Sequence, residues 1–200
     1  MLESMRLSEL QLPLSGRLVG ADASFTAVST DSRAIEPGQL FIALTGPRFD
    51  GHAYLADVAA KGAVAALVER EVADAGLPQL VVADTRLALG QLGALNRAAF
   101  NGPVAAITGS SGKTSVKEML ASILRSAHGQ DAVLATRGNL NNDLGAPLTL
   151  LELSTSHRSA VIELGASRPG DIAYTVDLVR PDVSVITNAG TAHVGEFGGP

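Results

Sequence analysis

The sequence contains no cysteine and no tryptophan, and its aromatic residues are two tyrosines and five phenylalanines among 200 residues. Without cysteine, the chain can form no disulfide, no thiolate metal site and no cysteine nucleophile. So few aromatics argue against a protein that stacks nucleic-acid bases. Fifteen basic against twenty acidic residues give a net charge of −5, without the cationic surface that nonspecific nucleic-acid binding needs. We therefore expect no nucleic-acid partner.

A membrane segment is also absent from the pattern. No apolar run approaches the roughly 20 residues that a spanning helix requires. The first ten residues, MLESMRLSEL, carry early acids and lack the apolar core of a signal peptide. Hydrophobic residues make up 46% of the chain, which argues against disorder. We expect a folded cytoplasmic protein, long enough for one large or two small domains, with no membrane insertion.

Strands and helices alternate along the chain. Residues 1–82 combine short apolar strands, such as Phe25 to Val28 and Leu40 to Leu44, with a helix from His52 to Lys61. A helix capped by Asp84 or Thr85 follows. Beyond it, apolar strands at 104–107, 132–135, 160–164 and 183–187 alternate with helices near 144–153 and 171–178. The pattern predicts an α/β protein: a small α/β domain over 1–82, then a phosphate-loop-type parallel sheet over 83–200 covered by helices on both faces.

The sharpest motif is a Gly/Ser-rich turn between the apolar strand at 104–107 and an amphipathic helix. Glycines let the backbone approach phosphate oxygens, and the helix N-terminus adds partial positive charge. The lysine can neutralise β- and γ-phosphate oxygens, and the following threonine can offer its hydroxyl to Mg²⁺. The full pattern would place glycine where Ile107 stands, so an ordinary turn with a surface lysine is the alternative. The candidate residues are Thr108, Gly109, Ser110, Ser111, Gly112, Lys113, Thr114 and Ser115.

Two neighbouring strands end in further candidates. Ligands of open α/β sheets bind beyond the carboxyl ends of the strands. Glu163 ends one strand and can reach a Mg²⁺ held by a nucleotide; the alternative is a buried acid paired with an arginine. His193 follows another strand and can join a second metal or orient a phosphate; the alternative is an exposed loop histidine. The spacing of the four histidines does not predict a zinc site.

Polar residues elsewhere leave two interpretations open. Asn139, Asn141 and Asn142 precede a helix, where they would either bind a polar substrate or form an Asx turn that caps the helix. Arg33 or Arg48 would grip a diphosphate, or else form a salt bridge and an ordinary turn.

Several segments carry a resemblance to a known family. The stretch 108–114 matches that family's phosphate loop, including the absent first glycine. Thr-Asp-Ser-Arg at 30–33, Pro-Gly-Gln-Leu-Phe-Ile-Ala at 37–43 and Asp-Gly-His at 50–52 are similar to its UDP-binding domain. Further matches are Glu-Leu-Gly-Ala at 163–166 and Ala-His-Val-Gly-Glu-Phe-Gly at 192–198. The chain thus resembles the N-terminal part of a Mur ligase, a family of ATP-dependent amide-forming enzymes of peptidoglycan precursor synthesis.

The resemblance implies roles for matching residues. Lys113 and its loop would hold ATP, Thr114 and Glu163 would ligate one Mg²⁺, and His193 would help to hold a second; Lys113, Glu163 and His193 would be catalytic. Asn188 would lie near the nucleotide. The UDP end of the substrate would contact Thr30, Asp31, Ser32, Arg33, Gly46 and Arg48, and the peptide-bearing substrate would contact Asn139, Asn141 and Asn142.

The segment Gly-Asn-Leu-Asn-Asn-Asp-Leu-Gly-Ala-Pro-Leu-Thr-Leu-Leu at 138–151 resembles the family member that adds D-alanyl-D-alanine more than the member that adds the third residue. The implied reaction joins D-alanyl-D-alanine to UDP-N-acetylmuramoyl-tripeptide through an acyl phosphate, in a monomeric enzyme. The alternatives are a sister Mur ligase that adds one amino acid, a non-catalytic nucleotide and UDP-sugar binding fragment, and an unrelated kinase. Since the family's central domain is longer, the resemblance implies that this chain covers it incompletely and that a metal-bridging carbamylated lysine lies beyond residue 200.

Overall fold

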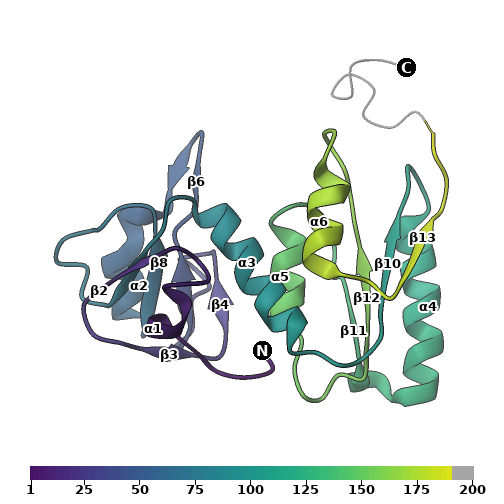
Figure 1. Ribbon diagram of the computed structural model, residues 1–200, viewed down its shortest axis with the longest axis horizontal. Coiled ribbons are helices and arrows are strands. Elements are labelled where there is room, and N and C mark those ends of the chain that lie inside the picture. Colours follow the sequence, from purple (N-terminus) through teal and green to yellow (C-terminus); the bar gives the residue numbers. More distant parts are fainter. Residues whose placement is uncertain (191–200) are drawn as a thin grey trace. The chain divides into compact units, whose positions relative to one another are not determined.

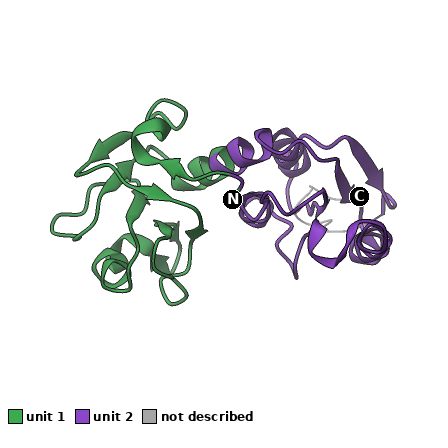
Figure 2. Ribbon diagram, turned by 90° about the horizontal axis from the view of Figure 1, so that it is seen from below, with its two compact units in different colours: residues 1, 3–91 green, residues 2, 92–200 purple. Residues whose placement is uncertain are grey.

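The computed structural model describes residues 1–190 and divides the chain into two compact units (Figure 2). The first comprises residue 1 and residues 3–91, and the second comprises residue 2 and residues 92–200. The division falls inside helix α3 (Thr85–Ala98). The boundary predicted between residues 82 and 83 lies just before this helix and stays a prediction. Asp84 caps α3 as expected, because its Oδ1 accepts hydrogen bonds from the N–H groups of Arg86 and Leu87.

The first unit is built on a five-stranded sheet (Figure 1). Its order is β2 (Arg17–Val19), β9 (Gln79–Val81), β8 (Ala65–Val68), β5 (Leu40–Ile42) and β4 (Val28–Ser29), parallel except for the pair β2 and β9. Two small antiparallel pairs accompany it, β1 (Met5–Arg6) with β3 (Ser24–Phe25), and β6 (Thr45–Gly46) with β7 (Phe49–Asp50). The helices are α1 (Leu7–Leu10), the 3₁₀ turn η1 (Gly51–Tyr54) and α2 (Leu55–Ala60).

Two predicted elements of this unit differ from the structure. The strand expected over Phe25 to Val28 is two strands, because Phe25 pairs with Met5 while Val28 pairs with Leu40 in the larger sheet. The helix expected from His52 begins instead as the 3₁₀ turn η1 and becomes α-helical at Leu55.

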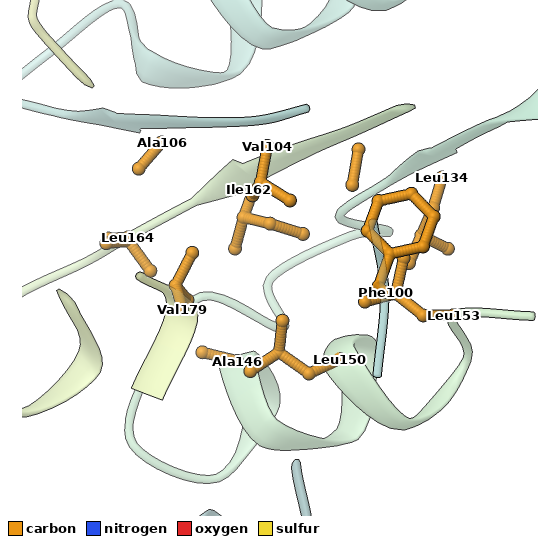
Figure 3. Close-up of a cluster of buried hydrophobic side chains, with 11 residues drawn as sticks. Phe100, Val104, Ala106, Leu134, Ala146, Leu150, Leu153, Ile162, Leu164 and Val179 are labelled. Atoms are coloured by element: carbon orange, nitrogen blue, oxygen red, sulfur yellow. The ribbon is translucent and has the colours of Figure 1, made fainter. Parts of the chain in front are cut away.

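The second unit contains a parallel sheet in the order β11 (Val133–Ala135), β12 (Ser159–Glu163), β10 (Val104–Thr108) and β13 (Val183–Ile186). Alternate residues of β10 and β12 face opposite sides. On one side, Val104 and Ile162 pack against α5 (Gly145–Leu151) and α6 (Asp171–Val179), as Figure 3 shows. On the other side, Ile107 and Val161 pack against α4 (Lys113–His128). The predicted parallel sheet with helices on both faces is therefore confirmed.

Burial is uneven across this sheet. Every residue of β12 is buried, whereas every residue of β13 is exposed, with Val183 at 61% and Ile186 at 71%. The cover expected on both faces therefore does not extend to β13 among the described residues. None of the helices in residues 1–190 combines the length and apolar character that crossing a bilayer demands.

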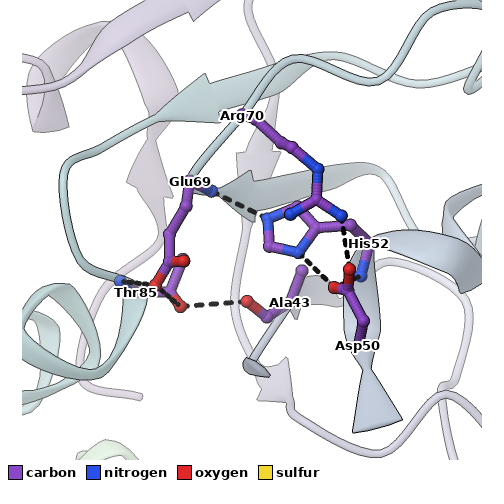
Figure 4. Close-up of polar contacts among 6 residues, drawn as sticks. All are labelled: Ala43, Asp50, His52, Glu69, Arg70 and Thr85. Atoms are coloured by element: carbon purple, nitrogen blue, oxygen red, sulfur yellow. Dashed lines mark hydrogen bonds and ion pairs between the residues drawn. The ribbon is translucent and has the colours of Figure 1, made fainter. Parts of the chain in front are cut away.

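A buried histidine ties the first unit together (Figure 4). His52 is 3% exposed; its Nδ1 lies 2.7 Å from Asp50 Oδ1, and its Nε2 accepts the N–H of Glu69 at 2.9 Å. Because Nε2 accepts, the proton sits on Nδ1 and the ring is neutral. Asp50 also pairs with Arg70, and these two partners hold the pKa of its carboxyl well below the usual range, the hydrogen bond from Arg70 contributing most. Glu69 in turn accepts from the Thr85 hydroxyl at 3.1 Å.

We predict that His52→Ala lowers the free energy of unfolding of the first unit by about 2–4 kcal/mol, because it opens a cavity and leaves the half-buried N–H of Glu69 without its acceptor. Urea unfolding and hydrogen exchange of the Glu69 amide measure the effect. His128→Ala, at the exposed end of α4, is the control and should leave both unchanged. Equal urea midpoints and equal Glu69 exchange in the wild-type chain and His52→Ala would contradict the role given to His52.

Candidate phosphate-binding site

The Gly/Ser-rich turn lies between β10 and α4, as its sequence context predicts. Gly109 and Gly112 have φ angles of +138° and +78°, which L side chains rarely adopt. A Cβ at Gly109 would also collide with the hydroxyl of Thr187. Helix α4 begins directly after Gly112, so the N–H groups of its first turn have no acceptors within the helix. This geometry suits an anion at the turn.

Residues at the end of β13 hold the turn in place. The Thr187 hydroxyl donates to the Ser111 carbonyl at 2.6 Å. The Asn188 side chain accepts the Ser111 N–H at 3.0 Å and donates to the Ser111 hydroxyl at 2.9 Å, while the Asn188 carbonyl accepts the Ser110 N–H at 3.2 Å. The Ser110 hydroxyl bonds the backbone of Gly190. Asn188 thus contacts the turn, and Thr187 is a residue that the sequence reasoning missed, although its place after a neighbouring strand was a usable signal.

Two charged side chains, Lys113 and Glu163, form hydrogen bonds at the start of α4. The half-buried Lys113 donates from Nζ to the Gly109 carbonyl at 2.8 Å. Glu163, only 2% exposed, accepts the Thr114 hydroxyl at Oε2 at 3.0 Å. It pairs with no arginine among residues 1–190, so the alternative of an Arg-paired acid is not what the structure shows.

The oxygens of Thr114 and Glu163 are the donors that Mg²⁺ prefers. No group of three or more His, Asp or Glu side chains in the described part of the chain is placed to hold a metal by itself. Mg²⁺ keeps several waters in proteins and is bound by one or two carboxylates together with substrate phosphates. The donor set and the adjacent turn therefore fit a Mg²⁺–nucleotide, while His193 lies outside the described residues.

The three asparagines have different surroundings. Asn141 donates from Nδ2 to Glu163 Oε1 at 2.9 Å, so it lies at the carboxylate. Asn142 accepts the N–H groups of Leu144 and Gly145 and caps α5, as the Asx-turn alternative describes. Asn139 is exposed, and its carbonyl accepts the Asn141 N–H at 2.8 Å.

The candidates in the first unit form local structures. Arg33 donates from Nε and Nη2 to the Asp31 carboxylate at 2.9 and 2.8 Å. Hydrogen bonds from the Arg33 side chain and N–H lower the pKa of Asp31 to about 2, so this pair is ionised at neutral pH. The Ser32 carbonyl accepts Lys61 Nζ at 2.7 Å, and Thr30 is half-buried beside them. The salt-bridge alternative thus describes Arg33.

Arg48 lies exposed at the turn of the β6–β7 hairpin. Gly46 precedes it, where a Cβ would collide with the ring of Phe49. Nothing in residues 1–190 forms a hydrogen bond or an ion pair with the Arg48 side chain. The two predicted arginines therefore differ, since Arg33 is engaged and Arg48 is available.

Comparison with known proteins places this geometry in a family. A model of the Mur ligase family catalytic domain matches residues 24–97, and a model of the Mur ligase middle domain matches residues 107–199. The UDP-N-acetylmuramoyl-tripeptide--D-alanyl-D-alanine ligase of Escherichia coli (strain K12) is 51% identical over 195 residues, and the alignment covers 98% of this chain and 42% of that protein. The ligase of the same name from Haemophilus influenzae is 47% identical, with 97% and 43% covered.

Solved structures agree with these relatives. A crystal structure of MurF from Acinetobacter baumannii has a TM-score of 0.90 and 51% identity, covering 99% of this chain and 44% of that one. MurF ligase from Thermotoga maritima in complex with ADP has a TM-score of 0.75 and 35% identity, covering 84% and 38%. The chain spans less than half the length of each of these proteins. The two adjoining family models and the high identity along almost the whole chain show that it belongs to the Mur ligase family.

Proposed function

We propose that this chain supplies the UDP-substrate and nucleotide sites of an ATP-dependent ligase that joins D-alanyl-D-alanine to UDP-N-acetylmuramoyl-tripeptide. The contact between Thr114 and Glu163 beside the phosphate loop carries the nucleotide part of the proposal. The choice of D-alanyl-D-alanine is supported by the names of relatives that are about half identical to this chain. The reaction would take place in the cytoplasm, and the enzyme would act as a monomer.

The proposed nucleotide site uses groups that the turn already presents. The first-turn N–H groups of α4 would donate to the phosphates, as at other helix N-termini. Lys113 would exchange its bond with the Gly109 carbonyl for β- and γ-phosphate oxygens, whose charge grows during transfer. Asn188 would keep the loop in register through Ser111. The γ-phosphoryl group of ATP would pass to the terminal carboxylate of the tripeptide and ADP would be released. The dipeptide amine would then attack the carbonyl carbon of this acyl phosphate, so that the amide bond forms, inorganic phosphate leaves and the amine loses a proton.

Thr114 and Glu163 are the proposed Mg²⁺ ligands, and we propose His193 for a second metal. When bound, Mg²⁺ supplies neutralisation of charge on the phosphate oxygens. Glu163 is kept ready by its two side-chain contacts, with Thr114 at one oxygen and Asn141 at the other. In this proposal Asn141 therefore holds the Glu163 carboxylate by a hydrogen bond, and Asn139 is the asparagine that contacts the peptide-bearing substrate.

The first unit is proposed to bind the UDP end of the substrate. Arg48 is the available guanidinium, and it lies exposed in the turn between β6 and β7, two residues after Gly46. Figure 1 shows this hairpin at the label β6. Arg33 would first have to leave Asp31, whose carboxylate stays ionised down to a pH of about 2. Thr30 and Ser32 would then contribute to substrate binding mainly by setting the backbone conformation of that turn.

We predict that Lys113→Ala lowers kcat by about 100-fold or more, because one preorganised donor to developing phosphate charge is lost. The rate of phosphate release by the whole protein that carries this sequence measures it. Arg158→Ala is a matched control, because it also removes one positive charge but directly precedes β12, at the end of the strand away from Glu163. It should leave kcat unchanged. Near-normal turnover by Lys113→Ala would refute the nucleotide site.

We predict that ATP-dependent amide formation requires D-alanyl-D-alanine with UDP-N-acetylmuramoyl-tripeptide. The competing pair is meso-diaminopimelate with the UDP-substrate one residue shorter, which a sister ligase would use. Mass spectrometry of the UDP-linked product separates the two. Product from the second pair alone would transfer the proposal to the sister enzyme, and a phosphorylated product without an amide would indicate a kinase.

We predict that Arg48→Ala weakens binding of UDP-N-acetylmuramoyl-tripeptide by about tenfold or more, because a hydrogen bond to a charged group contributes about 1.5–3 kcal/mol. Arg33→Ala should have a smaller effect, since Arg33 is already paired with Asp31. Isothermal titration calorimetry of both variants makes the comparison. A larger loss in Arg33→Ala than in Arg48→Ala would reverse the assignment.

A further inference from the structure

Helix α4 carries a lysine on its buried side. Lys117 is only 2% exposed and lies among the residues with which α4 packs on the sheet, near Val116, Leu120 and Ala121. Burying an ammonium group is unfavourable even after the protein relaxes around it, and an apolar residue often replaces a buried charge without loss of stability. Packing alone therefore gives no reason for a lysine here.

The ammonium group of Lys117 has two partners that the structure records. Nζ donates to the Thr136 carbonyl at 2.7 Å and forms an ion pair with Glu118 Oε1 at 2.8 Å. The hydrogen bond from Lys117 keeps the pKa of Glu118 below its usual value, so the Glu118 carboxyl is ionised at neutral pH. Glu118 faces solvent, with its side chain 57% exposed, whereas the Thr136 carbonyl lies inside the unit. The inward bond of Lys117 thus ends on Thr136.

Thr136 connects this lysine to the candidate metal ligand. It follows β11 directly and is 2% exposed. Its hydroxyl accepts the backbone N–H of Glu163 at 2.9 Å, and its own N–H donates to the Val161 carbonyl at 3.1 Å. Where the parallel ladder between β11 and β12 ends, the Thr136 side chain therefore continues the pairing as far as Glu163.

The two routes from α4 to Glu163 start on one face of the helix. Thr114 and Lys117 are three residues apart, so they lie on the same side. Thr114 contacts the carboxylate directly, while Lys117 reaches the backbone of Glu163 through Thr136. Both the side chain and the main chain of Glu163 are thereby fixed relative to α4 and its phosphate loop.

We propose that Lys117 and Thr136 are positioning residues that hold the end of β12 so that the Glu163 carboxylate faces Thr114, ready for a divalent cation. The inference rests on the proposed function, because it takes Glu163 as a ligand of the nucleotide-bound Mg²⁺. Outer partners of metal ligands typically change metal affinity or activity by about 10- to 100-fold when they are removed. A role confined to packing would alter stability without altering the Mg²⁺ requirement.

The test compares Thr136→Val with Thr136→Ser, which differ in whether the hydroxyl is present. Binding of a fluorescent ATP analogue to this chain is titrated with Mg²⁺, and the half-saturating Mg²⁺ concentration is measured. Thr136→Val should raise it by about tenfold or more, and Thr136→Ser should restore the wild-type value. Lys117→Met, which keeps the length of the side chain and removes the ammonium, should shift it in the same direction. Thermal melting of each variant shows whether it is folded, and if Lys117→Met does not fold, the Thr136 pair decides.

Thr175→Val is the matched control. Thr175 is also fully buried, but its hydroxyl bonds the Asp171 carbonyl within α6, away from Glu163. It should lower the melting temperature and leave the Mg²⁺ requirement unchanged. Equal Mg²⁺ requirements for the wild-type chain and Thr136→Val, or an equal shift in Thr175→Val, would overturn the positioning role alone. If the wild-type chain binds the analogue with no dependence on Mg²⁺, the proposed metal site fails and the positioning role fails with it.

Discussion

The hydrogen bond between the Thr114 hydroxyl and the Glu163 carboxylate joins the start of α4 to the end of β12. One partner belongs to the phosphate loop and the other to a neighbouring strand, so the bond exists only if the parallel sheet has formed with β10 beside β12. A carboxylate that is almost fully buried must find donors, and here Thr114 and Asn141 provide them. The arrangement leaves hard oxygen donors beside a helix N-terminus, the chemistry that a metal–nucleotide requires.

The two units use buried polar groups differently. In the first unit, both ring nitrogens of His52 form hydrogen bonds, one with Asp50 and the other with the Glu69 backbone (Figure 4). His52 therefore contributes to the fold and has no free nitrogen for proton transfer. In the second unit, Lys117 and Glu163 are ionisable groups whose bonds converge on one edge of the sheet. The apolar cluster around Phe100 and Ile162 (Figure 3) packs on the face of that sheet opposite to the face that α4 covers.

Sequence reasoning placed the Gly/Ser-rich turn between a strand and a helix, and Glu163 at the end of a further strand, because both positions depend on chain order. It could not decide between neighbouring residues of the same type. Asn141 bonds Glu163 while Asn142 caps α5, a difference set by the backbone path between 140 and 145. Pairing partners are likewise tertiary, which is why Phe25 and Val28 lie in different sheets. Lys117 was missed because its burial depends on how α4 packs on the sheet, where Lys117 is buried while the apolar Met119 and Ile123 are exposed.

The contacts of Thr187 and Asn188 with Ser111 span 76 and 77 positions of the chain. Such contacts raise contact order and form late, because a long loop must close before they can be made. During synthesis, therefore, the motif at 108–115 would leave the ribosome long before the residues that shape it. A shortened chain ending before residue 187 would contain the complete motif at 108–115 and still lack the hydrogen bonds from Thr187 and Asn188 that hold the turn in its conformation.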